Sequence, residues 1–372
     1  MTLTGREMRT HIDEDGTLTL SLQSVVPGEP GDDEVIVRVE AAPINPSDLG
    51  LLIGPADMAS LERPDNASLR LHVPKERLAS VRGRLGQSLP IGNEGAGTVI
   101  AAGRNAKALE GKVVGMIGGA MYADYRRIAA RDVEVLPEGA SAADGAAMFV
   151  NPLTALGFVE TARMEGHSAI VHTAAASNLG QMLQKICLAD GIALVNVVRS
   201  AEQAQILRGI GARHVVNSRD EDFPAQLTAA IRETDATIAF DAIGGGTLGS
   251  EILQAMERAA AENASSYSRY GSDTFKQLYI YGGLDPAPVT LNRSGFGFQW
   301  SAGGWLLFPF LQKAGADVAS RMRQRVAAEL TTTFASHYTQ VIGLAKALEP
   351  DVLRRYERKA TGEKYLIDPR LG

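Results

Sequence analysis

The chain has 372 residues, of which 45% are hydrophobic and 22% are charged, so it is long enough for two globular domains with a sizeable core. Its formal net charge of −6 argues against a generic nucleic-acid or anionic-membrane surface, and we expect neither kind of partner. The single cysteine excludes an internal disulfide. With no apolar leader core and no bilayer-spanning apolar run, the sequence favours a cytoplasmic protein.

The first 140 residues predict short β-strands. Residues 35–39 alternate between apolar and polar side chains, and residues 92–102 form a strand punctuated by glycine. Further strands at 113–117 and 122–126 follow at short spacing, as in a compact β-barrel or sandwich. Residues 131–139 predict a strand and linker leading into a helix over 142–162, which carries the chain into the next domain.

The segment 171–180 predicts a strand, a tight turn of small residues and the start of a helix. This is the layout of a dinucleotide-binding βαβ unit, in which the backbone approaches a pyrophosphate and the helix N-terminus faces it. The glycine fingerprint is degenerate here, and the alternative is a buried strand entering a capped helix. On the first interpretation the turn supplies these cofactor-binding residues: Ala175, Ser177, Asn178, Leu179 and Gly180.

Strands alternating with helices continue beyond this turn. They are predicted at 192–198, 214–217, 236–241 and 277–281, and the pattern indicates an α/β fold with a doubly wound parallel Rossmann sheet. Ligands bind such sheets at the carboxyl ends of the strands. We therefore add the residues that end or follow these strands to the cofactor-binding set: Asn217, Ile243, Gly244, Tyr281, Gly282 and Gly283.

The residue after the second strand predicts which cofactor is used. An acid at this position holds the ribose 2′-hydroxyl of NAD, but the chain has Arg199 followed by Ser200. A guanidinium would clamp the 2′-phosphate of NADPH, and the serine adds a hydroxyl donor. The alternative is a solvated surface arginine, and we favour the phosphate role and NADPH.

The C-terminal residues 361–369 predict a short strand after a helix, which would return to the first domain. We therefore expect a catalytic domain made of residues 1–145 plus 301–372, with a dinucleotide-binding domain over 146–300 inserted in it.

Together these pieces resemble the medium-chain dehydrogenase/reductase superfamily, in particular its zinc-free, quinone oxidoreductase-like branch. The resemblance covers most of the chain and rests on the order of several weak motifs: residues 42–48, 92–99, 122–125, 151–155, 171–180, 207–212, 241–244 and 361–364. It implies that the β-rich domain is GroES-like, and that Asn45 and Thr154 lie against the nicotinamide. Tyr122 or Tyr125 would serve as a donor near the acceptor, although packing is the commoner role for such tyrosines.

The resemblance also bears on metals and assembly. Zinc-dependent relatives place a Cys among residues 45–48 and a His at Asn93, and this chain has neither, so we expect no metal. The lone Cys187 and six histidines show no ligand spacing, and Glu94 remains as a structural acceptor. A homodimer is expected because residues 288–291 predict an edge strand, which in similar proteins joins two subunits.

Two segments depart from the family pattern, at 55–90 and 263–276, and the Tyr or Arg expected after residues 45–48 is missing. The first segment is basic and predicts either a solvent-exposed surface insertion or a lid or subunit contact.

Without zinc, hydride transfer to an electrophilic small-molecule acceptor is the expected chemistry: a quinone or an α,β-unsaturated carbonyl. The alternatives are an enoyl-thioester reductase, whose coenzyme A phosphates would meet the basic segment, and a non-catalytic nucleotide-binding protein.

Overall fold

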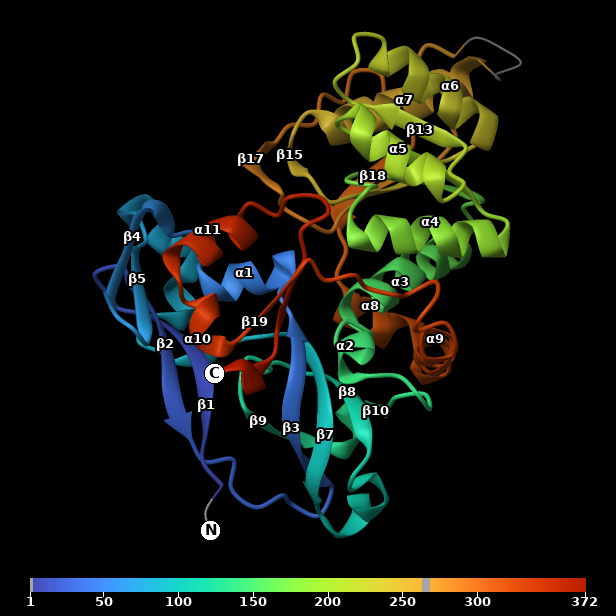
Figure 1. Ribbon diagram of the computed structural model, residues 1–372. Coiled ribbons are helices and arrows are strands. Elements are labelled where there is room, and N and C mark those ends of the chain that lie inside the picture. The colour runs from blue at the N-terminus through green and yellow to red at the C-terminus, as the bar shows by residue number, and fades with distance from the viewer. Residues whose placement is uncertain (1–2, 263–267) are drawn as a thin grey trace. The chain divides into compact units, whose positions relative to one another are not determined.

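A computed structural model describes residues 3–262 and 268–372, and these fall into two units (Figure 1). The β-rich unit comprises Met1–Val150 and Val326–Gly372, and the α/β unit comprises Asn151–Arg325. The predicted boundaries at 145/146 and 300/301 differ from these, because residues 301–325 continue the α/β unit. The predicted insertion of residues 263–276 lies partly outside the described residues.

The β-rich unit contains two sheets. The first is antiparallel, in the order β4 (Asp57–Asp65), β5 (Ser68–His72), β2 (Thr17–Val25), β1 (Gly5–Ile12) and β6 (Leu89–Pro90). The second runs β10 (Val133–Val135), β8 (Val113–Ile117), β7 (Glu94–Ala102), β3 (Glu34–Pro43), β20 (Tyr365–Ile367) and β19 (Gln340–Ile342), and β9 (Tyr125–Ala129) also pairs with β3. Alternation places Leu18 and Leu20 of β2 in the core and Thr17 and Thr19 toward the other face.

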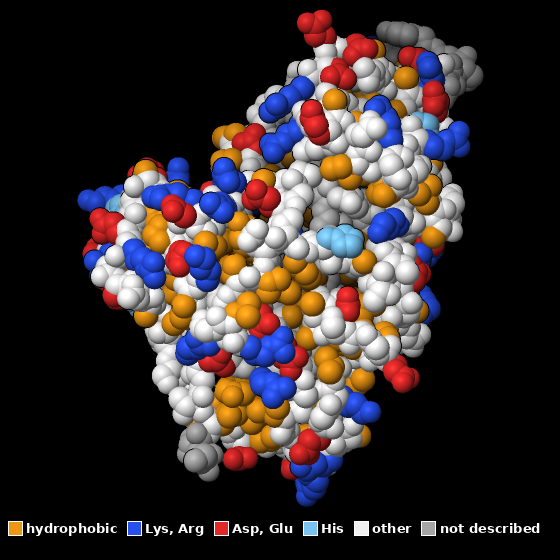
Figure 2. Space-filling view, in the orientation of Figure 1, with side chains coloured by type: hydrophobic (Ala, Val, Ile, Leu, Met, Phe, Trp, Pro, Cys, Tyr) orange, Lys and Arg blue, Asp and Glu red, His pale blue; other side chains and the backbone are white. Residues whose placement is uncertain are grey.

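The basic segment 55–90 forms the hairpin β4–β5 and the 3₁₀ segment η1 (Lys75–Arg84). The hairpin adds two strands to one end of the first sheet. Over this region Lys and Arg side chains are interspersed with Asp and Glu (Figure 2). The segment therefore presents mixed charge instead of a uniformly basic face.

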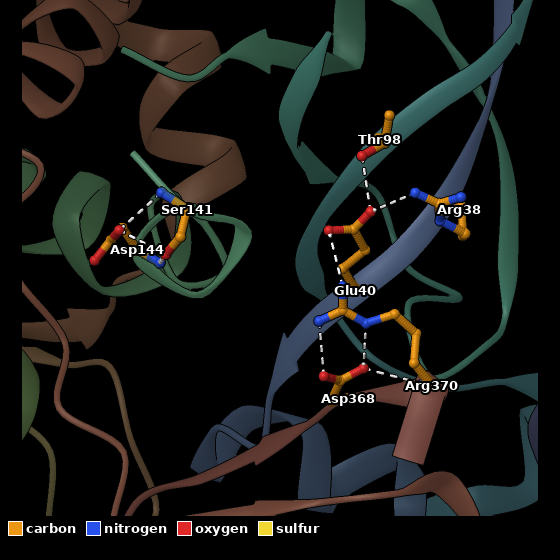
Figure 3. Close-up of polar contacts among 7 residues, drawn as sticks. All are labelled: Arg38, Glu40, Thr98, Ser141, Asp144, Asp368 and Arg370. Carbon is orange, nitrogen blue, oxygen red and sulfur yellow. Dashed lines mark hydrogen bonds and ion pairs between the residues drawn. The ribbon is translucent and has the colours of Figure 1, made fainter. Parts of the chain in front are cut away.

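The C-terminal strand β20 pairs antiparallel with β3, with Leu366 opposite Pro43 and Ile367 opposite Ala42. A charged network holds the chain end beside β3 (Figure 3). Arg370 forms an ion pair with Asp368 at 2.8 Å and another with Glu40 at 3.3 Å. The C-terminal strand β20 thus joins the second sheet beside β3, which comes from the N-terminal part of the chain.

Besides η1, the described helical segments of the β-rich unit are short: α1 (Pro46–Leu52), η2 (Arg104–Leu109), η3 (Ala130–Asp132), α2 (Ala142–Gly145), α10 (Leu344–Ala347), α11 (Pro350–Glu357) and η4 (Pro369–Leu371). The single helix predicted over 142–162 is wrong: α2 ends at Gly145, and α3 (Val150–Met164) begins after a break. Pro152 explains the break, because it has no N–H for a continuous helix but fits a first turn.

The α/β unit confirms the predicted doubly wound parallel sheet. Its strands follow the order β13 (His214–Asn217), β12 (Ala193–Val198), β11 (Ala169–His172), β14 (Ile238–Asp241), β16 (Lys276–Ile280) and β18 (Trp300–Gly304). The helices are α4 (Asn178–Asp190), α5 (Ala201–Gly209), α6 (Phe223–Thr234), α7 (Leu248–Glu262) and α8 (Leu307–Ala314), with α9 (Ala316–Ala328) crossing the unit boundary. Among the described helices, none is both long and apolar enough to cross a bilayer.

The edge of this sheet is not where the sequence placed it. Residues 288–289 belong to β17 (Asp285–Val289), which pairs with β15 (Gly244–Gly246) in a separate two-stranded sheet. The sixth strand of the main sheet is β18, which was not predicted. Its sequence, Trp-Ser-Ala-Gly-Gly, has two glycines and no alternation of apolar and polar residues, so it gives little strand signal.

Candidate active site

The small-residue turn connects β11 to α4. The hydroxyl of Ser177 caps α4 by accepting the N–H of Gly180 at 3.2 Å. Ala175 is fully buried and Leu179 almost so, and Asn178 is the first residue of the helix. The helix has 13 residues, and its N-terminal N–H groups and positive dipole end form an anion-binding position.

Arg199 and Ser200 follow β12, beside that turn in the strand order. The Ser200 hydroxyl caps α5 by accepting the N–H of Gln203, and the Gln203 side chain accepts the N–H of Arg199 at 3.0 Å. These bonds fix the backbone here and leave the Arg199 side chain exposed. Asn217 ends β13, and its amide donates to Asp220 at 2.6 Å within a local turn.

Asp241 and Thr173 organise the neighbouring turn, and the sequence analysis did not single out either side chain. The Thr173 hydroxyl donates to Asp241 at 2.6 Å, and the same carboxylate accepts the N–H groups of Ile243 and Gly244. Buried carboxylates that accept several N–H groups hold turns rigidly. The available signal was an Asp at the end of a predicted strand, two residues before Ile-Gly-Gly-Gly.

Tyr281, Gly282 and Gly283 follow β16. The Tyr281 hydroxyl lies 2.8 Å from Nε2 of His172, at the end of β11. His172 is fully buried, and burial lowers its pKa to about 3, so the ring is neutral. The structure thus brings the residues predicted to follow β11, β12, β14 and β16 to the carboxyl edge of one sheet (Figure 1). Thr154 lies on α3 and is buried.

In the β-rich unit, Asn45 and Glu94 form a buried pair. Nδ2 of Asn45 donates to Oε1 of Glu94 at 2.7 Å. The other oxygen of Glu94 accepts the N–H groups of Phe149 and Val150 at 2.9 and 2.8 Å, where α3 begins. Asn45 and Asp48 also form a capping box at the start of α1, in which the Asn45 side chain accepts the N–H of Asp48 and the Asp48 carboxylate accepts the N–H of Asn45.

Three ionisable side chains at this pair, Asp48, Glu94 and Lys364, are buried, and burial shifts the pKa of each. Burial raises the pKa of Asp48 to about 7, against the opposing effect of two backbone N–H groups that its carboxylate accepts. Burial also raises the pKa of Glu94, and the charge of Lys364 acts in the opposite direction. Burial lowers the pKa of Lys364 itself to about 8. The cluster holds two carboxyl groups and one ammonium group in low-dielectric surroundings, as functional sites commonly do.

The two candidate tyrosines are placed differently. Tyr122 is fully buried and its hydroxyl donates to the carbonyl of Pro43 at 3.1 Å, which favours a packing role. Tyr125 begins β9, packs against Gly5 and lines a surface hollow of about 400 Å³. Neither tyrosine is among the hydrogen-bond partners of Asn45 and Glu94 described above. No cluster of three or more metal-ligating side chains occurs within residues 3–262 and 268–372.

Comparisons place these features among known proteins. No family model matches the chain. The mitochondrial enoyl-[acyl-carrier-protein] reductase of Xenopus tropicalis is 28% identical over 290 residues, which cover 75% of this chain and 70% of that protein. The human protein of the same name is 24% identical over 269 residues, covering 70% of this chain and 61% of its own length.

Solved structures cover nearly the whole chain. A provisionally named NADPH:quinone reductase from Mesorhizobium loti is 25% identical with a TM-score of 0.74, covering 99% of this chain and 100% of its own. An enoyl thioester reductase from Candida tropicalis has a TM-score of 0.70 at 18% identity, covering 98% and 100% of the two chains. The Escherichia coli quinone oxidoreductase, solved with NADPH, has a TM-score of 0.68 at 20% identity and covers 99% and 100%.

Proposed function

The chain belongs to the medium-chain dehydrogenase/reductase superfamily, in its zinc-free, quinone oxidoreductase-like branch, and on that premise we propose that it is an NADPH-dependent reductase. The acceptor is a quinone or an α,β-unsaturated carbonyl compound, and the reaction uses no zinc. The observation that carries the proposal is the capped, closely packed turn before α4 together with Arg199 after β12.

The cofactor assignment follows from these two features. The N-terminus of α4 takes the pyrophosphate, and the Arg199 guanidinium and Ser200 take the 2′-phosphate that distinguishes NADPH from NADH. Ile243, Gly244, Tyr281, Gly282 and Gly283 follow β14 and β16 at the same sheet edge and line the remaining length of the cofactor. Asn217 serves the adenosine end.

The proposed reaction requires the protein to position the cofactor and the acceptor, and the acceptor needs little further activation. Bound NADPH supplies the hydride, and an acceptor already polarised by a carbonyl needs no Lewis acid. By resemblance, zinc-dependent relatives carry a Cys ligand among residues 45–48 and a His ligand at Asn93, and this chain has neither a Cys nor a His at these positions. Asn45 and Thr154 orient the nicotinamide, and Glu94 acts as a fixed acceptor that holds Asn45.

An enoyl-thioester reductase is the second candidate, because the mitochondrial proteins named above are enoyl-[acyl-carrier-protein] reductases. The mixed charge of the 57–84 region weakens the specific idea that it forms a binding face for coenzyme A phosphates. We therefore keep the quinone and enone acceptors first.

The protein acts as a homodimer in this proposal. The edge strand β18 carries backbone groups able to pair with a second copy, and Leu306 and Phe308 just beyond it are 65% and 64% exposed. Two copies paired along this edge would cover these apolar side chains.

A substrate panel tests the function. Oxidation of NADPH, followed at 340 nm, is measured with a quinone, an enone and an enoyl thioester at equal concentration. Turnover of the quinone or enone supports the proposal, and preference for the thioester supports the second candidate. Binding of NADPH with no turnover of any acceptor would indicate a non-catalytic nucleotide-binding protein.

A further inference from the structure

We propose that a hollow at the amino edge of the parallel sheet is a second ligand site, which binds a planar aromatic molecule carrying a carboxylate or phosphate group. This aromatic hollow has a volume of about 320 Å³ and is lined by Tyr270, Arg293, Ser294, Gly297, Phe298 and Trp300. Strands β16 and β18 begin beside it, with Lys276 opposite Trp300. It therefore lies at the opposite ends of the strands from the carboxyl edge proposed for NADPH, and the inference does not rest on the proposed function.

The aromatic hollow is formed by two stretches of chain that are joined to each other. Residues 268–276 are the described part of one of the two segments that depart from the family pattern, and residues 293–300 supply the other wall. The N–H of Phe298 donates to the carbonyl of Ser272 at 3.0 Å and links the two stretches. The departure from the family pattern thus contributes directly to the hollow.

The buried Glu257 carboxylate holds both stretches in place. It forms an ion pair with Lys276 at 2.7 Å and accepts the N–H and the hydroxyl of Ser272 at 2.7 and 2.5 Å. A Cβ at Gly271 would lie 2.6 Å from a Glu257 oxygen and 2.6 Å from Cα of Gly297, so the two stretches pack closely over this carboxylate. A buried polar network that is satisfied in this way is rigid, so the hollow is formed before a ligand arrives.

Three aromatic side chains offer flat surfaces to a ligand. Tyr270 and Phe298 are 64% and 68% exposed, and both line the hollow. The Trp300 ring packs edge to face against buried Phe296, with ring centroids 5.1 Å apart. The Arg269 guanidinium lies over the Tyr270 ring, 4.7 Å from its centre. Exposed rings gathered around one hollow gain by stacking against a planar ligand, because stacking removes apolar surface from water.

Arg293 determines the charge of the ligand. It is the only charged residue among those that line the hollow. Its side chain is exposed and forms no ion pair or hydrogen bond with the rest of the described chain. A guanidinium can donate two parallel N–H groups to a carboxylate or a phosphate, and no acid in the lining opposes such a ligand.

The combination of rings and cation specifies the ligand more narrowly than either feature alone. Flat apolar walls would take any planar molecule, and an exposed arginine by itself binds an anion weakly. A volume of about 320 Å³ is at the lower end for ligand pockets and suits one or two fused rings. Two sources share this chemistry: an aryl carboxylate, and a nucleoside monophosphate whose base stacks in the same way.

Titration calorimetry on the full chain tests the site. The protein is first saturated with NADPH, so that nucleotides do not enter the cofactor site. Naphthoate is compared with neutral naphthalenemethanol, and adenosine monophosphate with adenosine. In at least one pair the anion should bind roughly five- to tenfold more tightly than its neutral partner. Cyclohexanecarboxylate, which has the charge but no flat ring, should bind more weakly than naphthoate.

Two variants separate the contributions of charge and stacking. Arg293→Gln removes the cation and should lower the affinity for the anion to that of its neutral partner. Phe298→Ala removes a stacking surface and should weaken both members of a pair by a similar factor. Arg213→Gln and Phe275→Ala are the matched controls and should bind as the wild type does. Arg213 is an exposed arginine just before β13 at the same sheet edge, and Phe275 is an exposed ring outside the lining.

The outcomes decide the inference. An anion preference that is lost in Arg293→Gln and kept in both controls supports it, and the pair that shows the preference identifies the source. A wild type that binds no probe, as it would if a second copy covered the hollow, overturns the inference. Binding that folded Arg293→Gln and Phe298→Ala both leave unchanged also overturns it. A wild type that binds naphthoate through Arg293 but does not bind NADPH overturns the proposed function alone.

Discussion

The carbonyl oxygen of Ala175 occupies the space that a side chain at Gly180 would need, because a Cβ at Gly180 would lie 2.1 Å from that oxygen. No L-residue with a side chain fits such a distance without moving the backbone. The close approach sets where α4 begins relative to β11, and therefore where its N-terminal N–H groups point.

Gly180→Ala should destabilise the protein by at least about 2 kcal/mol, because the clash is with backbone and cannot be relieved by a rotamer change. The same change should displace the start of α4, and a displacement that costs about 1.4 kcal/mol of binding free energy lowers the affinity for NADP⁺ about tenfold. Gly209→Ala is the matched control, because a Cβ at that exposed helical position meets no described atom within 4 Å apart from its chain neighbours and the backbone of its own helix. Urea unfolding and NADP⁺ titration of both variants measure the difference, and equal stability for the two would contradict the packing argument.

Arg199→Asp should reverse the cofactor preference. Removing the guanidinium forfeits a charge-assisted contact to the 2′-phosphate of roughly 1.5–3 kcal/mol, or about one to two decades in affinity. The new carboxylate repels that phosphate and can accept from the ribose hydroxyls of NADH. Fluorescence titration with both cofactors at one fixed salt concentration checks this, with exposed Arg208→Asp as the control. An unchanged NADPH/NADH ratio in Arg199→Asp would show that other residues hold the phosphate.

His172 should make the protein less stable in acid. Its folded pKa of about 3 lies below the ordinary value of 6.5, so between these limits the unfolded chain binds a proton that the folded chain does not. The contribution is therefore fully present above about pH 6.5 and is lost toward pH 3, by up to ~1.4 kcal/mol per pH unit. Denaturant unfolding at pH 7, 6 and 5 should show a shallower loss in His172→Gln than in the wild type. Exposed His337→Gln should retain the wild-type slope, and equal slopes for all three proteins would rule out the assignment.

The order of elements could be predicted because each rests on local signals. Apolar strands followed by small residues identified β11, β14 and β16, and an apolar run before Arg199 identified β12. These strands define the carboxyl edge where Arg199 and Gly244 lie. Periodicity and glycine position carry that information without any knowledge of long-range contacts. The β18 strand was missed for the same reason, since Gly303 and Gly304 give no local strand signal and only pairing with β16 makes it a strand.

The polar pairs of the site could not be predicted, because they join residues far apart in the sequence. Glu94 reaches Asn45 from β7 and the start of α3 at Val150. Lys364 enters the same surroundings from the residue before β20. Local composition and residue spacing do not predict contacts between residues so far apart in the sequence. The break before α3 could have been predicted, because Pro152 lies within the helix expected over 142–162 and proline marks a helix start. The sequence analysis did not apply this signal.

Pairing along β18 should produce the homodimer. Trp305 N–H donates to the carbonyl of Ile280, so by strand alternation the N–H of Ala302 points away from β16 toward the free edge. Ala302→Pro removes that outward donor and places a ring where a second copy would pair, while leaving the bonds to β16 in place. Light scattering at micromolar concentration should show a dimer for the wild type and for the control Ala302→Ser, and a monomer for Ala302→Pro. Because Leu306 and Phe308 would then lose their cover, the proline variant should also bind more of a hydrophobic dye. A wild type that is monomeric, or an Ala302→Pro variant that remains a dimer, would show that β18 is not the subunit interface.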